Sequence, residues 1–220
     1  DMKCKGPIHI IPNGVDIKLF SKTYLEEEKK SLIENLGKKK GNIFLVTTSR
    51  LVPKNGIADV IEAMRFLPER FKFLIIGTGP LELSLKALVT SCQLQQRVSF
   101  LGHIDYADIP KYLAVSDIFI RPSLSEGMGN SFVEGMVAGI PVIGTQEGGI
   151  ADFLFDPEKN PDKEPTGFAV NVNDPKDIAR QCKRIVEDAS LRGHVIENAR
   201  ALARMKYDWN GITQSMRALF

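Results

Sequence analysis

The stretch IFLVTTSRLVPKNGIADVIEAMRFL, Ile43–Leu67, contains one strand–loop–helix unit. It opens with Ile43–Thr48, a run of apolar and β-branched residues that is continuous rather than alternating. Such a run is typical of a strand buried on both faces of a parallel sheet. After a polar loop, apolar side chains recur at helical spacing, at Ile57, Val60, Ile61, Met64 and Leu67. The stretch therefore predicts a strand followed directly by a helix, the repeating unit of a doubly wound sheet.

The same alternation continues along the chain. Short runs rich in Ile, Val and Phe predict further strands at Ile8–Ile11, Phe73–Ile76, Val98–Leu101, Ile118–Ile120, Val142–Gly144 and Phe168–Val170. Helical patterns lie between them at 81–89, 109–113 and 132–138, and the last third predicts helices at Asp177–Asp188, Ser190–Met205 and Asp208–Phe220. We therefore expect an α/β fold with a doubly wound, mainly parallel, Rossmann-like sheet in a single domain, residues 1–220.

Two charged segments lie outside this pattern. Lys38–Lys40 is a basic run before a strand, and Asp156–Pro165 holds three prolines and six charged residues. Neither segment has enough apolar surface to pack, so both are predicted to be exposed loops.

The composition narrows the class of protein. The chain has 220 residues, of which 43% are hydrophobic and 25% charged, as is ordinary for a soluble globular protein. A net charge of +2 gives no electrostatic reason to expect a nucleic-acid partner. The three cysteines are scattered, which argues against a disulfide framework and a zinc site and favours a reducing, cytoplasmic location. No apolar run approaches the length of a membrane span.

Two acidic residues stand out in Ser125-Glu-Gly-Met-Gly-Asn-Ser-Phe-Val-Glu-Gly135. Glu126 lies in a glycine-rich loop before a predicted helix, and Glu134 lies about one turn inside that helix. A helix start exposes unpaired N–H groups, which suit a phosphate or sugar hydroxyls, while carboxylates accept hydrogen bonds from hydroxyls. A glutamate near a helix start is also favourable for dipole reasons alone, so that interpretation stays open.

Cations and glycines follow other predicted strands. Arg50 and Lys54 lie in the loop after the first quoted strand, where they suit a diphosphate or, alternatively, surface ion pairs. Gly77 and Gly79 form half of a dinucleotide-binding fingerprint, but a tight strand-to-helix turn explains them equally well. His103 follows another strand, and a single histidine is more often packed or solvated than part of a site.

Several segments in order resemble one family. They are similar to the C-terminal, donor-binding domain of family-four retaining glycosyltransferases, whose GT-B fold has two Rossmann-like domains. The segments that carry the resemblance are Ile10–Asp16 with Phe20, Ser49–Ile57, Ile75–Pro80, Val98–Gly102, Pro122–Val142 and Gly148–Gly149.

The resemblance implies roles for the polar residues. Arg50, with Lys54 beside it, would bind the diphosphate of a nucleotide-sugar donor, Glu134 would accept hydrogen bonds from the ribose, and Glu126 would touch the transferred sugar. Arg50, Lys54 and Glu126 are thus the candidate catalytic residues. Backbone N–H groups of the loop and helix start would meet the sugar and phosphate, at Gly127, Met128, Gly129, Asn130 and Ser131.

The rest of the donor would lie against neighbouring loops. The Gly77–Gly79 turn and the backbone near His103 and Ile104 would flank the base and ribose. The family needs no metal or other cofactor for its chemistry, because cationic side chains and a helix dipole stabilise the leaving diphosphate.

Some positions depart from the family pattern. Asn55 holds the place where the family usually has lysine, and Lys54 lies one position earlier. Asp152 stands where glutamate is frequent, and Gly135 replaces an alanine.

The resemblance also implies a missing half. The chain is expected to start at an interdomain linker, so an N-terminal domain would bind the unknown acceptor and supply any peripheral membrane association. The helix at 208–220 would return to that domain. The parent would transfer a hexosyl unit with retention, and this chain alone would be inactive.

Other functions remain open on the sequence. A glycoside phosphorylase or a sugar-phosphate synthase would use the same fold. A non-catalytic nucleotide-binding module is favoured by Asn55. A nicotinamide dehydrogenase fits poorly, because the complete Gly-x-Gly-x-x-Gly near the first strand is missing.

Overall fold

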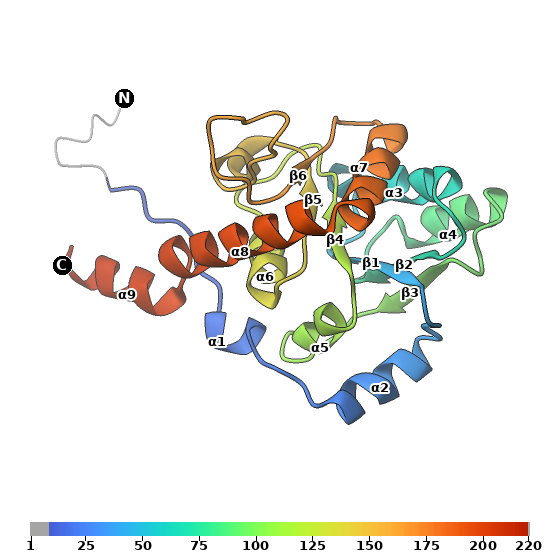
Figure 1. The fold of residues 1–220 in the computed structure, drawn as a ribbon, viewed down its shortest axis with the longest axis horizontal. Coiled ribbons are helices and arrows are strands. Elements are labelled where there is room, and N and C mark those ends of the chain that lie inside the picture. The colour runs from blue at the N-terminus through green and yellow to red at the C-terminus, as the bar shows by residue number, and fades with distance from the viewer. Residues whose placement is uncertain (1–8, 220) are drawn as a thin grey trace.

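The computed structural model describes residues 9–219 (Figure 1). Its strands form one six-stranded parallel sheet in the order β3-β2-β1-β4-β5-β6. Because the strand order reverses between β1 and β4, a crevice is expected at the carboxyl ends of these two strands. The predicted doubly wound sheet is therefore confirmed. The strands are β1 Ile43–Thr48, β2 Phe71–Ile76, β3 Val98–Gly102, β4 Ile118–Arg121, β5 Val142–Gly144 and β6 Phe168–Ala169.

Helices cover both faces of this sheet (Figure 1). The α-helices are α1 Ile17–Phe20, α2 Glu26–Asn35, α3 Ile57–Ala63, α4 Glu82–Ser91, α5 Ile109–Ala114, α6 Asn130–Ala138, α7 Pro175–Glu187, α8 Ala189–Lys206 and α9 Trp209–Arg217. Short 3₁₀ turns are η1 Pro53–Asn55, η2 Met64–Phe66 and η3 Gly148–Asp152.

Successive strand residues divide between two hydrophobic layers. In β1, Leu45 belongs to the layer packed under α3, α4 and α7, while Phe44 and Val46 belong to the layer under α5, α6 and the second half of α8. This is the two-residue period of a strand, here with apolar residues on both sides. Both faces are buried, which explains why the strands appear in the sequence as continuous apolar runs.

The strand predicted at Ile8–Ile11 is wrong for residues 9–11, and residue 8 lies outside the described part of the chain. Ile10 is 94% exposed. Together with Ile11 and Pro12 it borders a groove beside the end of α8 and the start of α9. The apolar run therefore lies against helices rather than in the sheet. The nearest strand-like contact is a single bridge between Val15 and Asp208.

Helix α2 was not predicted. It has no buried residue, so it lacks the apolar stripe that reveals a helix in a sequence. Its local signal is acidic: Glu26, Glu27 and Glu28 occupy the first turn, and the Glu28 carboxylate accepts from the backbone N–H of Leu25 at 2.9 Å. Acidic side chains at a helix start are favoured by the helix dipole.

The loop predicted at Asp156–Pro165 is exposed over most of its length, but Asp156 itself is fully buried. Its Oδ2 accepts from the N–H of Ala169 at 2.9 Å and from Nε2 of Gln181 at 3.0 Å. One buried carboxylate thus ties the loop to β6 and α7.

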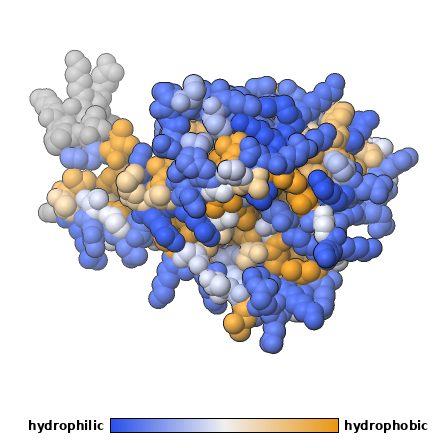
Figure 2. Space-filling model, viewed as in Figure 1, coloured by the Kyte–Doolittle hydropathy of each residue, from blue (hydrophilic) through white to orange (hydrophobic). Residues whose placement is uncertain are grey.

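Several exposed apolar side chains lie around α9. Figure 2 shows hydrophobic residues gathered at the end of the molecule where the N-terminal segment and α9 lie. The exposed side chains there are Ile10, Met205, Trp209, Met216 and Leu219. Within residues 9–219, no helix combines the length and the hydrophobicity that crossing a bilayer requires.

The described cysteines, Cys92 and Cys182, are free thiols. Burial raises the pKa of the Cys182 thiol to about 12. Cys4 lies outside the described residues.

Candidate functional site

The loops that follow β1, β4 and β5 meet at one edge of the sheet. The N–H of Leu124 donates to the carbonyl of Lys54 at 2.7 Å, which joins the loop after β4 to the loop after β1. The N–H of Gly149 donates to the carbonyl of Glu126 at 3.2 Å, which joins the loop after β5 to the same place. The cationic and acidic loops singled out in the sequence are therefore neighbours.

An open cleft of about 440 Å³ lies at this edge. It contains six of the predicted site residues, together with five others. Its lining is Asn13, Thr48, Tyr106, Ile109, Arg121, Glu126, Met128, Gly129, Asn130, Ser131 and Glu134.

Helix α6 points its N-terminus into this cleft. It begins at Asn130 after Gly129, whose φ of 76° lies in the left-handed region that glycine adopts without strain. Among the residues that the structure describes, no side chain caps this end of the helix, and its first turn carries no acidic residue. The N–H of Phe132 donates to the carbonyl of Gly129 at 2.9 Å, so the N–H groups of Asn130 and Ser131 are the ones available to an anion or to ligand oxygens.

Arg121 is the main site residue that the sequence prediction missed. It ends β4, is 7% exposed, and its Nη2 donates to Oε2 of Glu126 at 2.6 Å. Burial lowers the pKa of the guanidinium, while Glu126 and then Glu134 oppose that effect. A signal was present: a charged residue directly after the buried strand Ile118–Ile120 must find a partner, because a buried charge is costly when unpaired.

Glu134 is an unusual carboxyl group. It is 8% exposed, and burial raises its pKa from the ordinary value of 4.5 to about 7. The hydroxyl of Tyr106, by hydrogen bonding, and the charge of Arg121 both act in the opposite direction. Burial and the negative charge of Glu134 in turn raise the pKa of Tyr106. The cleft thus holds a carboxyl that changes protonation near neutrality.

This shifted pKa makes stability depend on pH. Between about pH 4.5 and 7 the unfolded chain releases the Glu134 proton while the folded chain keeps it, so the free energy of unfolding should fall with rising pH. A shift of this size corresponds to a fall of about 3 kcal/mol. Urea unfolding of the unaltered chain and of Glu134→Gln at pH 4.5 and 7.5 measures it. The stability difference between the two proteins should change with pH, and a constant difference would contradict the assignment.

Arg50 and Lys54 are exposed and lie on the loop after β1, outside the lining of the cleft. Asn55 is buried, and its Nδ2 donates to the carbonyl of Arg50 at 2.7 Å. Asn55 therefore shapes the loop instead of offering a charge.

Close backbone packing explains why glycine occupies positions 77 and 79. A Cβ on Gly77, whose φ is 128°, would collide with the carbonyl oxygen of Ser49. A Cβ on Gly79 would lie 2.5 Å from the carbonyl oxygen of Leu51. The two glycines let the loop after β2 pack directly on the loop after β1, as the tight-turn interpretation requires.

His103 and Ile104 follow β3. The His103 side chain is 78% exposed and lies 3.5 Å from Asp105, while Ile104 packs against the core. Neither lines the cleft, whereas Tyr106, two residues beyond Ile104, does. Gly127 also lies outside the lining, between Glu126 and Met128.

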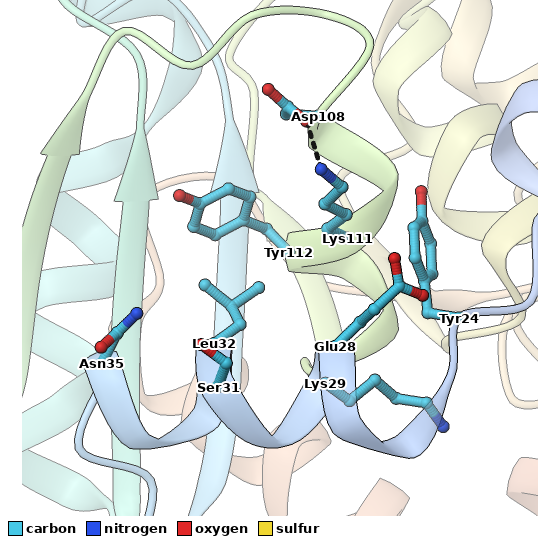
Figure 3. A pocket seen from close by; sticks show the side chains of 9 residues that line it. All are labelled: Tyr24, Glu28, Lys29, Ser31, Leu32, Asn35, Asp108, Lys111 and Tyr112. Carbon is cyan, nitrogen blue, oxygen red and sulfur yellow. Dashed lines mark hydrogen bonds and ion pairs between the residues drawn. The ribbon is translucent and has the colours of Figure 1, made fainter.

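A second cavity, of about 280 Å³, lies between α2 and α5 (Figure 3). Leu32 and Tyr112 line it from the two helices, and Lys111 pairs with Asp108 at its rim at 2.7 Å. None of the predicted site residues borders this cavity. Among residues 9–219, no three side chains of His, Cys, Asp or Glu gather as metal ligands.

A wound parallel sheet with a polar cleft at the carboxyl ends of β1 and β4 defines a Rossmann-like ligand-binding domain. The family model described as glycosyl transferases group 1 matches residues 28–202. The chain belongs to this family.

Known proteins are similar over most of the chain. The GDP-mannose-dependent monoacylated alpha-(1-6)-phosphatidylinositol monomannoside mannosyltransferase of Corynebacterium glutamicum is 29% identical over 209 residues, which are 90% of this chain and 52% of that protein. The structure of Anabaena HepE in complex with UDP and glucose superposes with a TM-score of 0.85 at 25% identity, covering 96% of this chain and 56% of that one. Sucrose-phosphate synthase of Thermosynechococcus elongatus gives a TM-score of 0.82 at 25% identity, covering 96% and 51%.

The coverage values show how much of each relative the chain matches. The chain spans about half the length of the curated relatives it matches, 52% and 48% for the first two. Its similarity therefore concerns one of the two halves of such proteins.

Proposed function

We propose that this chain is the donor-binding half of a glycosyltransferase that moves a hexosyl unit from a nucleotide sugar to an acceptor, with retention. One observation carries the proposal: the uncapped N-terminus of α6 opens into a cleft that also contains Glu126 and Glu134. Helix N–H groups suit phosphate, and the two carboxylates suit hydroxyls of ribose and sugar. The similarity to a structure described with UDP and glucose supports it.

Each part of the donor has a proposed partner. Glu134 accepts from the ribose hydroxyls, and Glu126 contacts the transferred sugar. The N–H groups of 127–131 bind sugar and phosphate oxygens. The base and ribose lie against the Gly77–Gly79 turn and the backbone near His103 and Ile104.

The leaving diphosphate is stabilised by fixed positive charge. Arg50 and Lys54 stand on the loop that is hydrogen-bonded to the loop of Glu126, which supports a role for their long side chains in binding a diphosphate at the α6 terminus. Two cations and a helix dipole supply the charge that the reaction needs without a metal.

The acceptor binds elsewhere. We propose a second, N-terminal domain that holds the acceptor, contacts the apolar surface around α9, and provides any association with a membrane surface. The half-length match to the relatives supports this division. This chain alone then binds nucleotide without turning over, and it works in the cytoplasm.

Calorimetry with UDP, GDP and ADP tests the proposal. At least one of them should bind the 220-residue chain saturably, with a Kd of about 1 mM or tighter. Glu134→Ala should weaken that binding, because the ribose loses its acceptor.

The matched control is Glu69→Ala. Glu69 is exposed and precedes β2, at the opposite edge of the sheet, so its removal should leave the affinity unchanged. No heat with any of the three nucleotides would refute the function.

Two alternatives keep the fold. The similarity to a sucrose-phosphate synthase supports a sugar-phosphate synthase or a phosphorylase as an alternative. Product analysis of a full-length protein with sugar-phosphate and phosphate acceptors separates these reactions. A non-catalytic module is favoured by Asn55, whose side chain serves the loop. Intact nucleotide affinity in Lys54→Ala would strengthen that alternative.

A further inference from the structure

A buried cation interacts with both acids of the cleft. Arg121 is 7% exposed and pairs with Glu126, while its charge also acts on Glu134. Arginine is rarely buried unless paired, and here a single guanidinium serves two carboxyl groups of the same site.

The guanidinium is fixed in one orientation. Its Nε donates to Oγ of Ser123 at 3.2 Å, and its Nη1 reaches the carbonyl of Thr48 at 3.5 Å. Its centre lies 4.8 Å from the ring centroid of Phe132, a cation–π contact. With Nη2 on Glu126, each nitrogen has a different partner, so the planar group cannot turn without breaking several contacts.

Glu126 is held in turn by Arg121. One carboxylate oxygen accepts from Nη2 at 2.6 Å, and the other accepts from the N–H of Gly127 at 3.2 Å. A carboxylate has about four acceptor positions, so it keeps capacity for a hydroxyl in the cleft that it lines. Because Glu126 stands on a glycine-rich loop, its side chain would otherwise lose conformational freedom when a ligand binds.

We propose that Arg121 is a positioning residue, which orients Glu126 toward the hydroxyls of the transferred sugar before the donor arrives. The inference rests on the proposed donor site and adds a determinant of sugar binding to it. Arg121 lines the cleft, but its three guanidinium nitrogens are held by Ser123, Thr48 and Glu126, so it acts on the sugar through the acid, and its loss should affect the sugar moiety more than the nucleotide.

The test compares a nucleotide with its sugar conjugate. Using UDP and UDP-glucose, or GDP and GDP-mannose if the guanine nucleotide binds, calorimetry of the full chain gives the gain in affinity that the sugar provides. Arg121→Met should reduce that gain by about tenfold while changing the affinity for the plain nucleotide less than about threefold. Glu126→Gln should reduce it similarly, and the double variant should lose no more than either single variant.

Two further readouts separate positioning from a general structural role. Arg121→Met should raise the pKa of Glu134 above the value of about 7, because a cation that lowers it is gone, and ¹³C titration of the carboxyl measures this. Arg121→Lys keeps the charge without the planar fork. Compared with Arg121→Met, it should restore the Glu134 pKa but only part of the affinity that the sugar adds. If Arg121→Met does not fold, Arg121→Lys carries the comparison alone.

The outcomes are distinct. Absence of nucleotide binding by the unaltered chain would overturn the proposed function. Nucleotide binding with an unchanged sugar gain in Arg121→Met, or in Arg121→Lys where only that variant folds, would overturn the positioning role alone. Equal losses for nucleotide and conjugate would do the same, because they indicate general damage to the cleft.

Discussion

Replacing Arg50 with alanine is expected to remove most of the affinity that a nucleoside diphosphate has over its nucleoside. The Arg50 side chain is exposed, so it is free to reach a ligand, and Asn55 fixes the backbone of its loop. A hydrogen bond to a charged group contributes about 1.5–3 kcal/mol, which corresponds to roughly a 10- to 100-fold loss. Calorimetry of the nucleoside and its diphosphate, with both proteins, measures the change.

The control for this change is Arg70→Ala. Arg70 is also exposed but precedes β2, at the edge of the sheet away from the cleft. Its loss removes the same net charge, so it reports any long-range electrostatic effect. If Arg50→Ala and Arg70→Ala give the same diphosphate affinity as the unaltered chain, Arg50 has no role in donor binding.

Replacing Asp156 with alanine is expected to cost about 3–5 kcal/mol of unfolding free energy. The carboxylate is fully buried, and its loss would leave the N–H groups of Ala169 and Glu158 without their acceptor. Nε2 of Gln181 would lose one of its two acceptors, and Arg184, 3.7 Å away, would lose a charge partner. Urea unfolding monitored by circular dichroism gives the difference.

Asp162→Ala is the matched control for Asp156. Asp162 belongs to the same loop and is exposed, so its removal should change the stability by less than about 0.5 kcal/mol. Equal effects of the two substitutions would mean that the buried network does not hold the loop to β6 and α7.

The fold was predictable because the strands are buried on both faces. Ile43–Thr48 and Val142–Gly144 were predicted with the observed bounds, and the predictions for β2, β3, β4 and β6 differ by one or two residues at their ends. The same rule fails at 9–11, where an apolar run borders a groove beside α8 and α9 instead of entering the sheet. It cannot detect α2 either, since that helix buries no residue.

The candidate site was predictable only in part. Glu126, Glu134 and the start of α6 share one local segment, so spacing alone places them together. Arg121 and Tyr106 come from two other segments, and their approach to the acids depends on the sheet order and on the packing of the loops. The burial of Asp156 was not predicted, because the residue stands at the start of a proline-rich, charged segment that is typical of an exposed loop.

A crystal structure of the chain with UDP, or with the nucleotide that binds best, tests the central claim most directly. The diphosphate should lie within hydrogen-bonding distance of the N–H groups at the start of α6 and of the Arg50 guanidinium, with the ribose hydroxyls on Glu134. Nucleotide bound in the cavity between α2 and α5, with the cleft of Glu126 and Glu134 empty, would contradict it.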